Sequence, residues 1–439
     1  MTVSNYEKKI GINCFFTTTP GVNGKLRAFQ EDFIVEEQSI YPPEELDRRF
    51  VIARVTSKNW ETNLLIREIS NRLHVSRKKI GFAGTKDKRA ITTQLMSLCA
   101  PAEDVTNIMI RGVNIENLYT SNKPVKIGSL VGNSFKIVVR NIELEKSVAF
   151  ERIQQIISFI LCNDGFPNFY GVQRFGAIRP ITHVVGKYVV EDDFEKAVMT
   201  YVANPIRGEN EKAYEVRKFL QETRDFPEAL KSYPNHLNFE KAILNRLVVD
   251  PKDFVDALKI LPKNLLMMFI HAYQSYIFNK ILSERIKRKF PLNKAIVGDI
   301  VLPIRKKTLS FDKNGILVTE KNIEKINKQI AKDKAYVSGL LPGFDSGFSH
   351  GEMGEIEHKI VEHEKADLRD FVIPEIPFLS SSGSRRSLLT PLKKIDWKLQ
   401  KDKLNNEKLA LTLEFKLPKG CYATSLLREL MKSRDVTNY

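Results

Sequence analysis

Residues 409–417 read LALTLEFKL, and this stretch near the end of the chain decides which fold we expect. Its apolar residues alternate with polar or small ones, which is the two-residue period of a strand that buries one face. The same alternation occurs earlier in the chain, where Phe135, Ile137 and Val139 share a face. Two such strands, far apart in the sequence, indicate a core that is built from both ends of the chain.

Between these strands the chain has longer helical stretches with lysine-rich connections. A helical period predicts helices over four segments, residues 62–73, 147–161, 216–226 and 264–290. We therefore predict an α+β protein, in which residues 1–176 and 380–439 form a discontinuous core with a mixed or antiparallel sheet and flanking helices. Residues 177–379 are predicted to form an inserted α/β domain, since 439 residues exceed one ordinary domain.

The charge balance favours a polyanionic partner. The chain has 69 Lys and Arg against 53 Asp and Glu, which gives a formal net charge of +16. Cations that neutralise phosphates release counterions and so favour binding to nucleic acid. Three basic runs are either a track for RNA phosphates or solvated surfaces: residues 284–290, 304–307 and 384–387. A lysine-rich or thermophilic proteome would give a similar balance, so charge alone does not decide the function.

The cysteines and the apolar segments limit the cellular context. Four cysteines lie far apart without a CxxC pair, at Cys14, Cys99, Cys162 and Cys421, so neither a disulfide framework nor a zinc site is indicated. The N-terminal sequence MTVSNYEKKI lacks the apolar stretch of a signal peptide, and the most apolar run, residues 265–270, is too short to cross a bilayer. We expect a cytoplasmic protein without a membrane segment, and we expect it to be a monomer.

The segment richest in chemistry is KIGFAGTKDKRAITTQ, residues 79–94, in which Asp87 stands among four basic residues. Nearby cations favour the charged form of a carboxyl group, and an ionised carboxylate can act as a nucleophile. The residues alone equally allow a structural role, in which Asp87 caps a turn and pairs with Lys86 or Lys88. The segment is not a phosphate-binding P-loop, because the GxxxxGK[ST] spacing is absent.

This segment resembles the signature of the TruD family of tRNA pseudouridine synthases, and it does not stand alone. Four more segments resemble other blocks of that family, in the family's order: residues 25–37, 131–141, 166–176 and 415–430. Weaker similarity occurs at residues 271–279 and 340–346. The resemblance implies a pseudouridine-synthase-type core with the insertion typical of the family, acting on a uridine of tRNA at position 13. It implies no redox cofactor, nucleotide or metal, because the reaction exchanges neither electrons nor phosphate.

The resemblance also implies roles for individual residues. Asp87 corresponds to the family's nucleophile, and Arg27 to a basic residue that pairs with it, although Lys25 and Lys86 are close rivals and a solvated Arg27 is the alternative. An extruded uridine gains by stacking and by hydrogen bonds to its edge. Around that pocket the resemblance places Phe33, Asn133, Phe135 and Tyr422. From strand periodicity alone, Phe33 and Phe135 would be ordinary core residues.

Other segments leave alternatives open. FPNFYGVQRFG, residues 166–176, has the composition of a loop that contacts the RNA backbone or supports the pocket. The main rival function is a non-catalytic RNA-binding or ribosome-assembly factor, against which Asp87 argues because an acidic residue repels phosphate. A metal-dependent nuclease would need clustered carboxylates. Strand alternation would instead separate Glu31 and Glu37 from Asp32 and Glu36.

Overall fold

The computed structural model describes residues 2–86, 88–305, 310–311 and 315–435. The chain forms two compact units, which we call the sheet unit and the helical unit. The sheet unit comprises Thr17–Phe166 and Thr390–Ser433, and the helical unit comprises mainly Met1–Phe16 and Pro167–Leu389. The boundaries predicted at residues 176/177 and 379/380 both fall within the helical unit, which also takes in the start of the chain.

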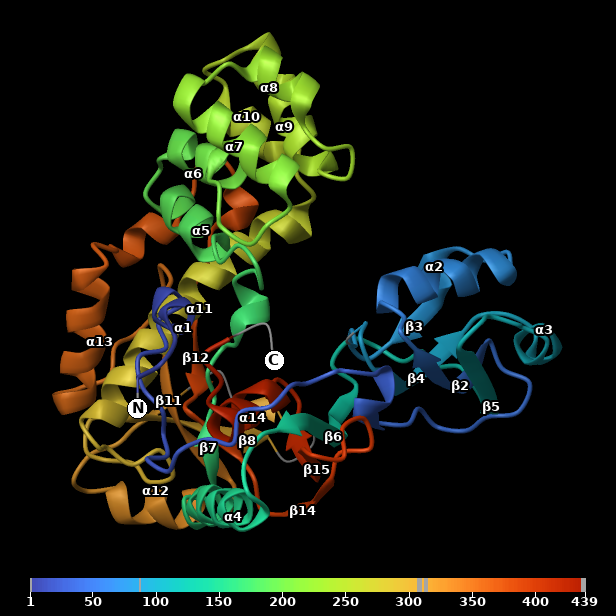
Figure 1. Ribbon diagram of the computed structural model, residues 1–439, viewed down its shortest axis with the longest axis vertical. Coiled ribbons are helices and arrows are strands. Elements are labelled where there is room, and N and C mark those ends of the chain that lie inside the picture. The colour runs from blue at the N-terminus through green and yellow to red at the C-terminus, as the bar shows by residue number, and fades with distance from the viewer. Residues whose placement is uncertain (1, 87, 306–309, 312–314, 436–439) are drawn as a thin grey trace. The chain divides into compact units, whose positions relative to one another are not determined.

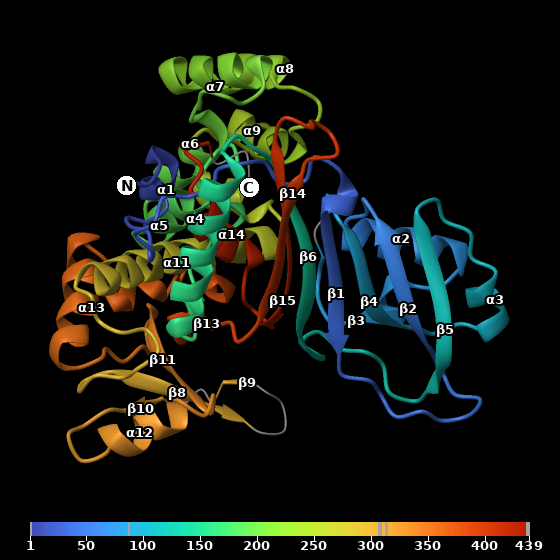
Figure 2. The same ribbon diagram turned by 60° about the horizontal axis from the view of Figure 1, so that its bottom comes forward.

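The sheet unit is organised around one twisted sheet, whose strands lie side by side in Figure 2. In order across the sheet the strands are β14 (Ile395–Lys401), β15 (Leu409–Pro418), β6 (Leu130–Ile142), β1 (Phe33–Ser39), β4 (Ile91–Leu98), β2 (Phe50–Lys58) and β5 (Val113–Ser121), and β3 (Ile80–Phe82) pairs with β4. Strands β1 and β4 run parallel, whereas the other pairs are antiparallel. The prediction of an α+β protein with a mixed sheet is therefore confirmed.

The two strands predicted from their alternation are neighbours in this sheet. Phe135 of β6 pairs with Phe415 of β15, and Ile137 pairs with Leu413. Because β15 lies between β6 and β14, residues from the end of the chain complete a sheet that residues from its first third begin. Alternation places the partners of each pair on the same face, and that face is apolar.

Helices cover this apolar face in two separate places. The sheet unit contains α2 (Thr62–Arg72), α3 (Ala102–Thr106), α4 (Lys146–Cys162) and α14 (Ala423–Met431). Of these, α2 and α4 lie close to their predicted ranges. Helices α4 and α14 pack against β1, β6 and β15, whereas α2 packs against β2 and β4. Helix α2 begins where the Glu61 carboxylate accepts hydrogen bonds from the backbone N–H groups of Asn63 and Leu64.

The strand predicted around residues 31–37 begins later than expected. Glu31 and Asp32 belong to a 3-10 turn, Gln30–Asp32, and β1 starts at Phe33. The Asp32 carboxylate accepts hydrogen bonds from the Phe29 backbone, 3.0 Å away, and from the Arg140 guanidinium, which closes the turn. The alternation expected for Glu31 and Asp32 was therefore wrong, because side-chain bonds to the backbone compete with strand pairing.

The helical unit is built around α11 (Lys263–Lys287), a 25-residue helix that begins one residue before the predicted range and ends three residues before its end. Its buried residues lie on all sides, as expected for a helix at the centre of a core. The other helices of this unit, several labelled in Figure 1, are α1 (Asn5–Lys9), α5 (Thr182–Val190), α6 (Phe194–Ala203), α7 (Glu211–Thr223), α8 (Phe226–Ser232), α9 (Asn238–Val249), α10 (Phe254–Lys259), α12 (Ile323–Ile330) and α13 (Gly351–His363).

A smaller sheet completes the helical unit. It contains β10 (Ile316–Leu317), β8 (Ile300–Arg305), β11 (Ala335–Leu341) and β12 (Ser384–Ser387) in that order, with β9 (Ser310–Phe311) paired to β8. Strands β7 (Gly165–Pro167) and β13 (Leu389–Pro391) form a separate two-stranded sheet. Among the described residues, none of the helices combines the length and the apolar character that crossing a membrane requires.

Candidate active site

The candidate site lies on the apolar face of the main sheet, at the point where polar side chains interrupt it. Asn133 of β6 is flanked across the sheet by Glu37 of β1 and Leu417 of β15. Two residues further along β6, Phe135 is flanked by Val35 and Phe415. Since side chains two residues apart share a face, Asn133 and Phe135 project to the same side as Glu37.

Aromatic rings occupy this face beside Asn133. The rings of Phe33 and Phe135 meet edge to face, with centroids 6.4 Å apart, and Phe135 stacks on Phe415 at 5.4 Å. The guanidinium of Arg27 lies 4.3 Å from the centroid of the Phe33 ring. Phe33 is 1% exposed and Phe135 is 9% exposed, so both rings belong to the hydrophobic core. The structure thus brings together three of the predicted residues, Arg27, Phe33 and Phe135.

The backbone holds Arg27 in an unusual conformation. Its φ of 56° lies in the left-handed region, which costs a residue other than glycine on the order of 1 kcal/mol. The preceding turn is fixed because Lys25 and Arg140 exchange backbone hydrogen bonds of 2.8 and 2.9 Å. At Gly24 a Cβ atom would lie 2.8 Å from the Arg140 carbonyl oxygen, so only glycine allows this approach. These contacts position Arg27 over Phe33.

An ion pair anchors the loop that leads to Asp87. The Lys86 ammonium donates to Glu37 Oε2 at 2.5 Å, and the Lys86 backbone N–H donates to Thr62 Oγ1 at 2.7 Å. Both charged side chains are buried. The loop is therefore tied to β1 on one side and to the start of α2 on the other. Asp87 itself lies outside the described residues.

Two buried amide oxygens face this polar region without a partner among the described residues. They are Oδ1 of Asn133 and Oε1 of Gln94. Gln94 lies on β4 two residues after Thr92, the partner of Val35, so it shares the face of Glu37. Leaving a buried acceptor unpaired costs about 1–3 kcal/mol, which makes both oxygens candidates for contacts with a substrate.

Sequence reasoning missed two residues of this region, Glu37 and Gln94. The strand period could have identified Glu37, because Glu37 follows Phe33 and Val35 on an otherwise apolar face of β1. A charged residue in such a place needs a partner. Its partner Lys86 lies 49 residues away along the chain, so local patterns could not reveal the pair.

Tyr422 lies just beyond the end of β15, on the side of Asn133. Pro418 pairs with Gly132, and the Lys419 N–H donates to the Val131 carbonyl at 3.0 Å. The chain then turns, and Tyr422 is the residue before the first turn of α14, with 36% of its surface exposed. The structure therefore places Tyr422 near the end of the strand that borders Asn133.

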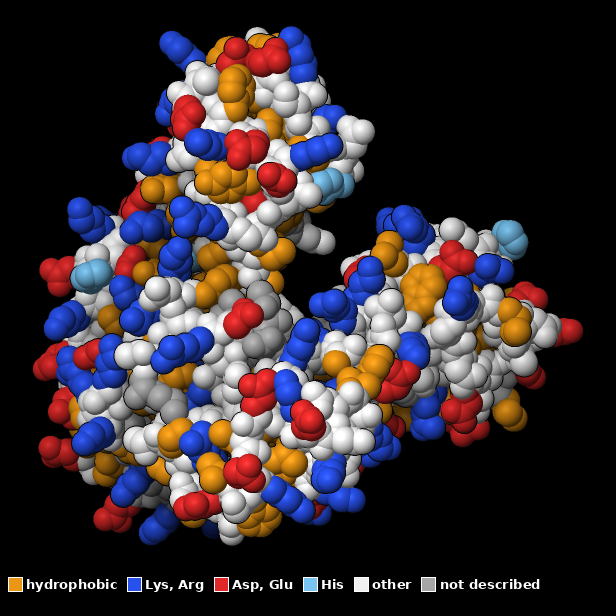
Figure 3. Space-filling model, in the orientation of Figure 1, with side chains coloured by type: hydrophobic (Ala, Val, Ile, Leu, Met, Phe, Trp, Pro, Cys, Tyr) orange, Lys and Arg blue, Asp and Glu red, His pale blue; other side chains and the backbone are white. Residues whose placement is uncertain are grey.

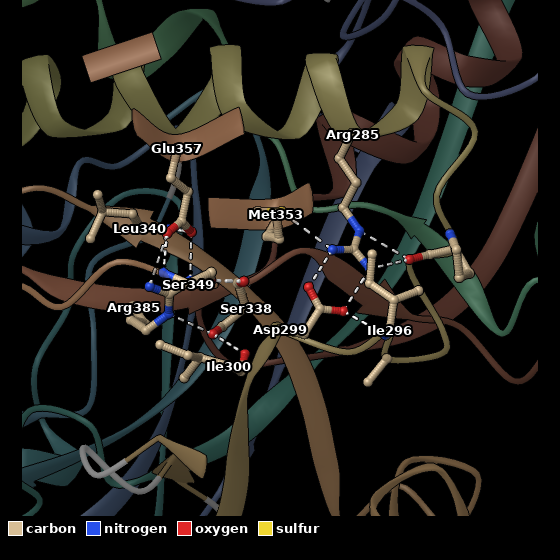
Figure 4. Close-up of polar contacts among 12 residues, drawn as sticks. Arg285, Ile296, Asp299, Ile300, Ser338, Leu340, Ser349, Met353, Glu357 and Arg385 are labelled. Carbon is tan, nitrogen blue, oxygen red and sulfur yellow. Dashed lines mark hydrogen bonds and ion pairs between the residues drawn. The ribbon is translucent and has the colours of Figure 1, made fainter. Parts of the chain in front are cut away.

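Two arginines of the basic runs fit neither alternative, the RNA track or the solvated surface, because each is paired with a carboxylate inside the helical unit. Arg285 is buried, and its guanidinium pairs with Asp299 at 2.6 and 2.9 Å. Arg385 is buried against Glu357, as Figure 4 shows. Residues 306–307 of a third run lie outside the described residues. Figure 3 shows Lys and Arg side chains interspersed with acidic ones on the face drawn.

The arrangement suits recognition of a planar base better than binding of a cation. Within the described ranges, no group of three or more His, Cys, Asp or Glu side chains is placed to hold a metal ion. The polar region instead offers amide oxygens that can accept from N–H groups, beside an aromatic cluster. Amide oxygens of this kind can accept hydrogen bonds from the N–H groups at the edge of a base.

Comparison with known proteins gives one consistent result. The family model for tRNA pseudouridine synthase D (TruD) matches residues 9–430. A Methanococcoides burtonii protein named "Probable tRNA pseudouridine synthase D" is 43% identical over 431 residues, which cover 98% of each chain. A Pyrococcus furiosus protein of the same name is 38% identical over 425 residues, covering 95% of this chain and 98% of that one.

A solved structure agrees with these relatives. The crystal structure of a Methanosarcina mazei protein, named as a tRNA pseudouridine synthase D (TruD), matches the fold with a TM-score of 0.89. The sequences are 40% identical, and the match covers 100% of both chains. Fold and sequence agree over the full length, which confirms the resemblance seen in the sequence segments. The chain therefore belongs to the TruD family of tRNA pseudouridine synthases, which are isomerases.

Proposed function

We propose that this enzyme converts uridine 13 of tRNA to pseudouridine with Asp87 as its nucleophile. The observation that carries this proposal is the buried pair of Lys86 and Glu37. It ties the residue before Asp87 to the sheet face that bears Asn133 and the aromatic cluster. Because the Lys86 ammonium is held by Glu37, the alternative in which Asp87 merely pairs with Lys86 is less favoured than it was from the sequence.

The reaction is an isomerisation, so every atom of the uridine is retained. The C1′–N1 bond breaks, the uracil turns over, and a bond forms between C1′ and C5, from which a proton is lost while N1 gains one. The Asp87 carboxylate is the group we assign to the covalent step. Attack at uracil C6 and attack at ribose C1′ both suit a carboxylate.

The neighbouring residues take supporting roles in this proposal. The unpartnered Oδ1 of Asn133 is a suitable acceptor for the uracil N3–H group. Arg27 would keep the Asp87 carboxylate ionised, because a nearby cation favours the charged form. Phe33, Phe135 and Tyr422 would support or stack on the extruded base.

The test is to incubate the protein with an unmodified tRNA transcript and to map pseudouridine by carbodiimide-dependent stops of reverse transcription. We expect one stop at position 13 with the wild-type protein. Asp87→Asn should abolish the stop while RNA affinity is retained, because the amide cannot act as the nucleophile. Asp104→Asn, which removes an exposed acidic residue of the same unit, is the matched control and should leave the stop unchanged. Turnover by Asp87→Asn at the wild-type rate would refute the assignment.

A further inference from the structure

The helical unit contains a polar cavity that the catalytic proposal does not use. Its volume is about 300 Å³, at the lower end of the range for ligand pockets. Three separate segments supply most of its walls: the loop after β7, the middle of α11, and the adjoining ends of β11 and β12. The polar and charged residues that line the cavity include Tyr170, Arg174, His271, Gln274, Ser275 and Ser384.

These segments are fastened to one another around the cavity. The buried side chain of Gln274, on α11, donates to the Pro342 carbonyl at 2.7 Å and to Ser381 Oγ at 2.8 Å. Leu341 pairs with Ser384 across β11 and β12. Gly383 has a φ of +76°, and a Cβ atom there would lie 2.7 Å from the Leu341 carbonyl oxygen. The walls are therefore fixed before any ligand binds.

A buried ion pair fixes the adjoining strand ends from behind, as Figure 4 shows. Oε1 of Glu357 accepts from the Leu340 N–H at 3.1 Å and from the Arg385 guanidinium at 2.5 Å, and Oε2 accepts from the Ser349 N–H at 2.7 Å. One carboxylate thus holds β11, β12 and the loop that follows β11. Such pre-organisation lowers the cost of binding a ligand.

The cavity is electropositive. The Arg174 guanidinium lies 5.2 Å from the centroid of the Tyr170 ring, and its buried Nε has no hydrogen-bond partner among the described residues. Burial lowers the pKa of His271, and the charge of Arg174 lowers it further, so His271 is neutral near pH 7. The described residues that line the cavity include no carboxylate. Arg174 is therefore a positive charge without a compensating acid in the cavity wall.

We propose that this cavity binds a backbone phosphate of the RNA substrate, with Arg174 as the charged contact. Arginine forms strong, directed hydrogen bonds to phosphate oxygens. Serine hydroxyls are typical of RNA and DNA backbone contacts, and Ser384 supplies one in the cavity wall. Gln274 and Ser275 donate to other protein groups, so they shape the wall and leave the charged contact to Arg174. The inference rests on the proposed function only in taking tRNA as the substrate. It makes residues 166–176 a contact for the RNA backbone.

The test measures the affinity of the intact protein for an unmodified tRNA transcript over a series of KCl concentrations. Each phosphate contact contributes a slope of about −0.7 to −0.9 to log K against log salt. We expect Arg174→Gln to reduce the magnitude of the slope by about that amount, and Arg174→Lys to restore much of it. Arg207→Gln removes an exposed arginine of the same unit and should leave the slope as in the wild type.

Thermal melting of each variant separates a binding role from a structural one. If Arg174→Gln weakens binding equally at every salt concentration and lowers the melting temperature, Arg174 supports the fold and the inference is wrong. If Arg174→Gln and Arg207→Gln change the slope by the same amount, the change comes from the loss of one positive charge anywhere on the protein, and the inference is also wrong. Because the assay measures binding and not pseudouridine formation, a protein that bound tRNA through Arg174 but made no pseudouridine would contradict only the proposed function.

Discussion

Lys86 and Glu37 form an ion pair inside the sheet unit, with Nζ and Oε2 2.5 Å apart and side-chain exposures of 6% and 0%. Glu37 Oε1 also accepts a hydrogen bond from Ser39 at 2.8 Å, so the carboxylate is well satisfied. A buried pair of this kind adds little net stability compared with apolar residues, but it tolerates the loss of neither partner. The ion pair therefore holds the loop before Asp87 in one place. Removing either charge should strongly destabilise the fold.

The first prediction concerns this pair. Lys86→Met leaves Glu37 as an uncompensated buried charge, so the free energy of unfolding should fall by about 3–5 kcal/mol, and pseudouridine formation should fall with it. Urea denaturation measures the loss. The control is Lys136→Met, which breaks a solvent-exposed pair with Glu414 in the same sheet and should cost less than about 1 kcal/mol. Equal losses of unfolding free energy in the two variants would show that burial does not make the Lys86–Glu37 pair more important for stability than an exposed pair.

The second prediction concerns Asn133. Leucine has a similar shape, and Asn133→Leu removes a buried oxygen that has no partner among the described residues, so stability should stay the same or rise. If Asn133 contacts the base edge as proposed, the kcat/KM for tRNA should fall by about 10-fold to 100-fold, because that contact is lost.

Asn168→Leu in the helical unit is the contrasting variant. Its Oδ1 accepts from Arg386 at 2.6 Å and its Nδ2 donates to the Ser387 carbonyl at 3.0 Å. Removing this amide breaks both hydrogen bonds in a buried place, and the melting temperature should drop. If Asn133→Leu also lowered the melting temperature by a similar amount, its oxygen would have a structural partner and not a role in substrate binding.

The third prediction separates packing from substrate stacking at Phe135. Phe415→Leu removes the stacked contact with Phe135, which should cost about 0.5–1.5 kcal/mol of stability beyond the loss of buried area. Phe135→Leu removes the same contact and the edge contact with Phe33, so it should cost somewhat more stability. If Phe135 also supports the uracil, its variant alone should lose a further 1–3 kcal/mol, roughly, in single-turnover measurements. Identical turnover in the two variants would assign Phe135 to the core alone.

The fourth prediction is a pH dependence of stability that originates at His183. Burial lowers the pKa of His183 to about 4, and the ring stacks on Tyr276 at 4.8 Å. Below pH 6.5 the unfolded chain binds a proton that the folded chain does not, so stability falls as the pH falls from about 6.5 towards 4. Between about pH 7.5 and 5, the loss from this residue is about 2 kcal/mol.

His183→Phe keeps the aromatic contacts and removes the titrating group. Urea denaturation at both pH values should show that the variant loses about 2 kcal/mol less than the wild type over this interval. A loss as large as in the wild type would mean that other groups account for the acid sensitivity.

The sequence predicted those elements whose signal is local. Helices α2, α4 and α11 and strands β6 and β15 followed from periodicity, because each buries one face or its whole surface along a continuous segment. The parallel pairing of β1 with β4 could not be predicted, because it depends on contacts between segments that periodicity treats separately. The residues of the site followed from the family resemblance, and their roles stay predictions.

Charged residues were the hardest to place from sequence. Arg285 belongs to a basic run, yet it is buried. Its guanidinium donates hydrogen bonds to both carboxylate oxygens of Asp299, which lies 14 residues further along the chain. Glu37 belongs to an acidic segment, yet it lies in the sheet because Lys86 compensates its charge. From composition alone, Arg285 and Glu37 would both be expected at the surface. Only the fold shows which charges are paired inside and which are free to meet a polyanion.

The central place of β15 in the sheet has a consequence for how the enzyme is made. Until residues 409–418 leave the ribosome, one edge of β6 has no strand beside it. At about 5–20 residues per second, residues 167–389 of the helical unit are synthesised during this interval, which lasts on the order of 10–50 s. An open strand edge is a site of aggregation, so the nascent chain must be protected for that time. A product truncated before β15 would lack the strand that joins β6 to β14, so the sheet can form completely only after residues 409–418 have been made.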